Sequence, residues 1–162
     1  EMLIEVVKRW QVQRQLNEWF LESASTGRLE RVHTLLRARF DVDPPSKPSA
    51  LDLAIERGRA DMVELLVSFP TPAHLPTGLS CARCSLATIH AHLRKAAEHE
   101  DGARAIAALT AKADPDHTSA KTHAYRTALM SFAAAGNLPL VQQLVEHNAQ
   151  VQWYDKFGCS AV

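Results

Sequence analysis

The chain has 162 residues, of which 46% are hydrophobic and 22% are charged. These proportions are typical of a globular domain and exclude a wholly disordered or low-complexity chain. The 18 Lys and Arg residues balance the 18 Asp and Glu residues. A dedicated nucleic-acid binder usually carries a basic excess, so nucleic acid is not an expected partner.

The cysteine content bears on the compartment. Three cysteines are too few, and odd in number, for the disulfide framework of a small secreted domain. We therefore expect an intracellular protein, in the cytoplasm by default, with a nuclear location left open.

No apolar run approaches the ~18 residues of a membrane-spanning helix, so we expect no membrane insertion. Because the chain starts at Glu1, we expect it to be part of a longer protein.

Residues 1–16 predict a leading helix. Apolar residues recur there at helical spacing, among them Leu3, Val7 and Trp10. Two interpretations stay open. The helix covers the exposed end of the first structural unit, as the terminal units of repeat proteins require, or it is the tail of an upstream domain.

A helix–turn–helix pattern then recurs along the chain. Gly27, Gly58, Glu100 and Gly136 occupy the predicted turn in four copies, and apolar or small residues occupy matching offsets on both sides of each turn. Glu100 replaces glycine in the third copy, which is the weakest. A period near 33 residues predicts helix pairs stacked into a solenoid. The alternative is a generic helical bundle, which would not explain why the turn and its flanking helices recur in the same order and at matching offsets in each copy.

Short segments around these turns resemble a known family. Thr127–Met130 resembles the Thr-Pro-Leu-His opening of an ankyrin repeat, and Asn148–Val151 resembles its Gly-Ala-Asp-Val-Asn close. Asp155–Ala161 resembles the Asp-x-x-Gly-x-Thr-Pro opening of a further repeat. Phe20–Val42 is similar to a first, capping-type repeat, and Ser49–Ala54 is similar to the start of the second. The chain is thus similar to the ankyrin-repeat family.

The resemblance implies an all-α ankyrin-repeat solenoid of stacked helix-turn-helix units with hairpin-like loops. Because the helices of the last repeat are missing, we expect Phe132, Leu144 and Val145 to be exposed on the outer face of the fourth repeat. The expected divisions are a capping helix at 1–16, a repeat domain at 17–162, repeats near 17–43, 44–70, 86–116 and 122–154, an insertion loop at 71–85, and a truncated repeat at 155–162.

The insertion contains a Cys-x-x-Cys pair, Cys81 and Cys84. Together with His74 and His90 these thiols could form a tetrahedral zinc site, since Zn²⁺ favours sulfur and nitrogen ligands. No second Cys-x-x-Cys pair is present, and the histidine spacing is not typical of zinc sites. We therefore expect ordinary reduced thiols and solvent-facing histidines, with a redox pair as a further alternative, and no cofactor.

The sequence contains no recognisable catalytic motif. Phosphate-binding glycine loops, the Gly-x-Ser-x-Gly nucleophile turn and the His-Glu-x-x-His zinc motif are missing. The histidines are scattered, and we expect His33 and His147 on the solvent side of second helices. We therefore expect a chain that is not an enzyme. The alternatives are a regulatory or substrate-targeting arm of a larger enzyme and a zinc-stapled scaffold.

The resemblance implies that a protein or peptide partner binds a concave face made of loop tips and first helices, with the fragment itself monomeric. A preordered surface binds with a smaller loss of conformational entropy. Trp, Tyr and Arg are enriched in binding hot spots, although aromatic rings at loop tips also pack against neighbouring loops. The candidate residues are Glu56, Arg57, Glu98, His99, His123, Tyr125, Arg126, Trp153, Tyr154, Lys156 and Phe157.

Overall fold

The structure, a computed structural model, describes residues 2–37, 48–69, 85–118 and 125–161. Within these ranges the secondary structure consists of eight α-helices and no strand, which confirms the all-α prediction. The helices are α1 (Met2–Thr26), α2 (Leu29–Arg37), α3 (Ala50–Glu56), α4 (Ala60–Ser68), α5 (Leu86–His99), α6 (Gly102–Thr110), α7 (Ala128–Ala134) and α8 (Leu138–Glu146).

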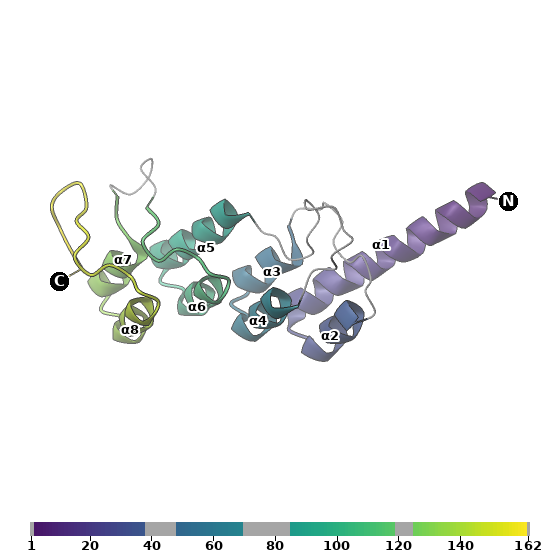
Figure 1. Cartoon of the computed structure of the whole chain (residues 1–162), viewed down its shortest axis with the longest axis horizontal. Coiled ribbons are helices and arrows are strands. Elements are labelled where there is room, and N and C mark those ends of the chain that lie inside the picture. Colours follow the sequence, from purple (N-terminus) through teal and green to yellow (C-terminus); the bar gives the residue numbers. More distant parts are fainter. Residues whose placement is uncertain (1, 38–47, 70–84, 119–124, 162) are drawn as a thin grey trace.

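The helices form four antiparallel pairs that lie side by side in a row (Figure 1). The first helices α3, α5 and α7 form one layer, and the second helices α2, α4, α6 and α8 form the other. Contacts run within each pair, for example α5 with α6, and between neighbouring pairs, for example α1 with α3 and α4 with α6. The buried core therefore extends along the row as a series of interfaces between pairs.

The same turn closes the first helix of every pair. Gly27, Gly58, Glu100 and Gly136 adopt left-handed φ angles of 78°, 65°, 57° and 71°. The residue after each turn donates its backbone N–H to a carbonyl of the preceding helix, which is how a Schellman motif satisfies a helix end. These bonds are Arg28 to Ser23 at 3.0 Å, Arg59 to Ala54 at 2.9 Å, Asp101 to Ala96 at 2.9 Å, and Asn137 to Phe132 at 3.0 Å. All four predicted turns are present, including the one at Glu100.

Matching positions around these turns are buried. Residues at equivalent places in the first helices, and others in the second helices, belong to one continuous hydrophobic cluster. Burial of such periodic apolar faces is the main stabilising contribution to a helix pair. The equivalent buried residues are Phe20, Leu51, Leu93 and Leu129 in the first helices, and Leu35, Leu66, Ala108 and Leu144 in the second.

Side-chain caps set where α3 and α7 begin. The Ser49 hydroxyl accepts a hydrogen bond from the Asp52 backbone N–H at 3.1 Å, and an Asp52 carboxylate oxygen accepts from the Ser49 N–H at 3.1 Å. This reciprocal pair is a capping box. The Thr127 hydroxyl accepts from the Met130 backbone N–H at 3.3 Å. The hydroxyl residues that open the repeats in sequence therefore start these helices in the structure.

The N-terminal helix differs from the separate capping helix predicted at 1–16. α1 runs without a break from Met2 to Thr26, so residues 2–16 continue the first helix of the first pair. No proline or glycine interrupts residues 1–26, so nothing in the local sequence ends the helix earlier. The N-terminal part of α1 extends away from the row of pairs (Figure 1).

The surplus residues before the third pair partly lengthen a helix. The predicted insertion loop, except for residue 85, lies outside the described residues. α5 contains 14 residues, whereas α3 and α7 contain 7 each. The Ser85 hydroxyl accepts from the Thr88 backbone N–H at 3.3 Å and so caps the start of α5. The extra length therefore includes about two added turns at the start of α5.

The predicted exposure of the fourth pair is correct for one residue of three. Val145 is exposed, whereas Phe132 and Leu144 are completely buried. Both buried residues belong to the same hydrophobic cluster as the preceding pairs. The prediction was wrong for them because the last pair directs these side chains into the shared core rather than toward its open side.

Candidate interaction surface

A tight turn at residues 155–159 holds the C-terminal loop. The Asp155 Oδ1 atom accepts hydrogen bonds from the backbone N–H groups of Phe157 at 2.8 Å and Cys159 at 2.9 Å. The Asp155 backbone N–H donates to the Cys159 carbonyl at 2.9 Å. Gly158, with φ of 80°, supplies the left-handed conformation that such a turn needs. The sequence between Asp155 and Cys159 thus fixes the loop locally.

The aromatic side chains of this loop divide into two kinds. Tyr154 is 64% exposed and Phe157 is 74% exposed. Trp153 is half-buried, and its indole nitrogen is buried without a hydrogen-bond partner in the described part of the chain. The Lys156 ammonium lies 4.9 Å from the centroid of the Phe157 ring, within the range of a cation–π contact. Tyr154 and Phe157 are available to a partner, whereas Trp153 packs within the protein.

Tyr125 and Arg126 lie at the start of the fourth pair and are exposed. The loop that follows α6 is tied to the segment after α8, because the Gln150 backbone N–H donates to Asp116 Oδ1 at 2.8 Å. The residues leading into α7 and the C-terminal loop lie on the same side of the row (Figure 1). His123, the remaining candidate of this group, lies outside the described residues.

The candidates at the ends of α3 and α5 form ion pairs within the chain. Glu56 lies 3.4 Å from the guanidinium of Arg104, which also donates to the Glu56 carbonyl at 3.3 Å. Glu98 lies 2.6 Å from the guanidinium of Arg94. A partner would have to compete with these pairs, so the two glutamates are weaker candidates than the aromatic residues. The other two candidates, Arg57 and His99, are exposed.

His90 stacks on His117, with ring centroids 4.2 Å apart and planes 25° from parallel. Burial lowers the pKa of His90, the neighbouring His117 lowers it further, and Asp114 opposes the shift. The contact joins the extended start of α5 to the loop that follows α6. His90 therefore has a structural contact that the sequence did not predict.

The predicted zinc ligands other than His90, namely Cys81, Cys84 and His74, lie outside the described residues. Among residues that the structure does describe, no group of three or more His, Cys, Asp or Glu side chains could hold a metal ion. The zinc hypothesis therefore rests on the sequence pattern alone.

A buried polar contact between α3 and α5 was missed at the sequence level. The His92 Nε2 atom lies 3.6 Å from Asp52 Oδ1, and both side chains are largely buried. His92 Nδ1 is buried without a partner among the described residues. The sequence contains a signal for this contact. His92 occupies the position that Ala50 and Ala128 occupy in the neighbouring copies, so a polar side chain stands where α3 and α7 bury an alanine.

No protein-family model matches the chain, and no curated protein matches it. In the described part of the chain, no helix combines the length and apolar character that crossing a bilayer requires.

Proposed function

We propose that the chain is a non-catalytic protein–protein interaction module, an ankyrin-type scaffold that binds a protein or peptide. The binding face consists of loop tips and the neighbouring ends of the first helices. The four copies of one turn geometry, at Gly27, Gly58, Glu100 and Gly136, support a repeat architecture. Cys159 is a free, exposed thiol, which suits a reducing intracellular compartment.

The exposure of Tyr154 and Phe157 on a fixed turn carries this proposal. Solubility does not require two aromatic side chains at a loop tip, and aromatic residues are enriched in binding hot spots. Asp155 binds two backbone N–H groups of the turn, so the loop is ordered before a partner arrives. A preordered loop loses less conformational entropy on binding.

The proposal is tested with peptides selected against the intact chain from a random display library. The Tyr154→Ala/Phe157→Ala double variant should bind the selected peptides at least about tenfold more weakly, as expected for hot-spot residues. Fluorescence anisotropy measures the dissociation constants, and circular dichroism checks that helicity is unchanged. A matched control is Val12→Ala/Val145→Ala, because these apolar side chains are also exposed but lie on α1 and α8.

Selected peptides that bind the aromatic double variant as tightly as the original chain would contradict the proposed face. Failure to select any specific peptide would contradict the interaction module itself.

A further inference from the structure

A groove of about 440 Å³ lies between the second helices α2 and α4. It is on the layer of second helices, whereas the proposed loop surface belongs to the C-terminal end of the row (Figure 1). The residues that line it are Leu29, Glu30, His33, Asp61, Glu64, Leu65 and Ser68.

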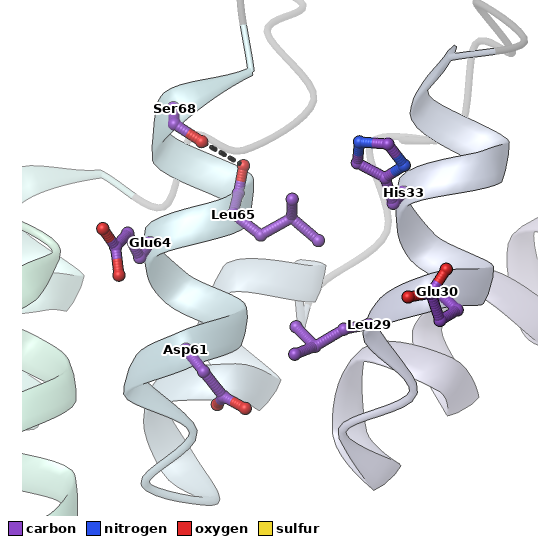
Figure 2. Close-up of a pocket in the computed structure, with 7 residues that line it drawn as sticks. All are labelled: Leu29, Glu30, His33, Asp61, Glu64, Leu65 and Ser68. Carbon is purple, nitrogen blue, oxygen red and sulfur yellow. Dashed lines mark hydrogen bonds between the residues drawn. The ribbon is translucent and has the colours of Figure 1, made fainter.

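Large side chains from both helices line the groove between α2 and α4. Leu29, His33 and Leu65 project into the space between the two helices (Figure 2). The turns approach the next pair more tightly on the other side of α4. A Cβ atom at Gly58 would lie only 2.6 Å from the Ala103 Cβ, whereas one at Gly27 would lie 3.3 Å from its nearest neighbour, the flexible Arg59 side chain. α2 offers no comparable alanine face toward α4.

The floor of the groove is apolar and its edges are acidic. Leu29 and Leu65 are partly buried against the hydrophobic core. Glu30, Asp61 and Glu64 also line the groove. The Glu30 and Asp61 carboxylates lie toward the space between the two helices, whereas the Glu64 side chain extends from the opposite side of α4 (Figure 2). Within the described residues none of the three forms an ion pair.

His33 completes one wall of the groove. Its ring lies edge-on to Phe69, with centroids 5.7 Å apart and planes at 85°. The sequence predicts a solvent-facing His33, but the structure places it half-buried between two helices. Among the described residues, no Lys or Arg lines the groove. The Arg59 guanidinium lies beside Gly27, at the turn end of these helices.

We propose that this groove is a second docking site, which binds a basic peptide segment of a partner protein. Arginine and lysine side chains have long aliphatic stems and cationic heads. The stems suit the Leu29 and Leu65 floor, and the heads suit the unpaired carboxylates at the edges. The site is separate from the loop surface, and its occupant is defined by charge complementarity.

The probe for this site is a fluorescein-labelled octapeptide of alternating arginine and leucine, measured by anisotropy at low ionic strength. Glu30→Gln/Asp61→Asn is the test variant, and Asp114→Asn/Glu146→Gln is a control with the same loss of charge. The Asp61 Oδ1 atom accepts from the Met62 backbone N–H, and the Asp114 Oδ1 atom accepts from the Asp116 N–H. Asparagine keeps an oxygen acceptor in both places, so local turns are retained.

The test variant should bind the peptide about five- to tenfold more weakly, which is the effect expected from two exposed charge pairs. The control variant should change binding less than about twofold. An arginine–serine octapeptide of equal charge should also bind more weakly than the arginine–leucine peptide, because it cannot use the apolar floor.

Amide chemical-shift changes on peptide addition should concentrate in α2 and α4. Equal weakening by both double variants, or shift changes confined to other helices, would overturn the docking site. Preferential binding of a glutamate–leucine octapeptide would overturn its assigned chemistry. None of these results bears on Tyr154 and Phe157, so the two proposals fail independently.

Discussion

The two sides of α4 show how side-chain volume controls the surface of this row of helix pairs. On one side α6 presents alanines, and Ala103 approaches the Gly58 turn so closely that a single added carbon would collide. On the other side α2 presents Leu29 and His33, and a groove opens. Small residues line the closely packed junction between α4 and α6, whereas large residues line the open groove between α2 and α4.

The largest expected effect on stability comes from a comparison of two adjacent leucines of α4. Leu66 is 3% exposed and belongs to the core, so Leu66→Ala should lower the free energy of unfolding by about 2–5 kcal/mol. Leu65 faces the groove and is only partly buried, so Leu65→Ala should cost about half as much or less. Urea denaturation followed by circular dichroism measures both values. Equal losses would show that the α2–α4 junction is as closely packed as the core.

The glycine turns provide a second test. Gly58→Ala must adopt a left-handed φ and also displace Ala103, from which the new Cβ would be 2.6 Å. We expect a loss of about 2–4 kcal/mol from strain and overpacking together. Gly136 is a matched control, because it is also left-handed but has no atom within 4 Å of the added Cβ. Its alanine variant should lose about 1–2 kcal/mol. Similar losses at both sites would contradict the tight α4–α6 junction.

A substitution in the turn of the third pair should stabilise the protein. Glu100 adopts φ of 57° where the other three copies have glycine. Glu100→Gly should raise the unfolding free energy by up to about 1 kcal/mol, because relief of left-handed strain outweighs the greater flexibility of the unfolded chain. Lys95→Gly, in the middle of α5, is the control and should destabilise by about 1 kcal/mol. Destabilisation by Glu100→Gly would show that the glutamate side chain contributes more than its strain costs.

The smallest expected effect is a pH dependence of stability that arises from His90. The folded structure lowers the pKa of His90 below its ordinary value of 6.5, so the unfolded chain binds a proton more readily there. The native state therefore loses stability as the pH falls below this value and regains it as the pH rises. The melting temperature of the original chain should fall slightly more between neutral and mildly acidic pH than that of His90→Asn. Identical pH profiles would exclude a role of His90 in this dependence.

The sequence was sufficient for the parts of the fold that depend on local pattern. The four turns follow from Gly27, Gly58 and Gly136 and from the register that placed Glu100 among them. The helix starts at Ser49 and Thr127 follow from their capping hydroxyls. These features need only neighbouring residues, so they can be read from one segment at a time.

The remaining features depend on how far apart the helices pack. The groove between α2 and α4 arises from side chains of two copies facing each other, and no single copy contains that information. The burial of Trp153 and the contact of His92 with Asp52 likewise depend on neighbouring segments. The continuity of α1 from Met2 to Thr26 was missed for a different reason, since residues 1–16 were treated as separate from the repeat pattern that follows them.

The main contacts between helices lie within pairs or between neighbouring pairs, and this arrangement has a kinetic consequence. Residues that touch are close in sequence, so little loop-closure entropy is lost before native contacts form, and such chains fold rapidly. Any one of the four pairs can serve as the nucleus from which order spreads in both directions.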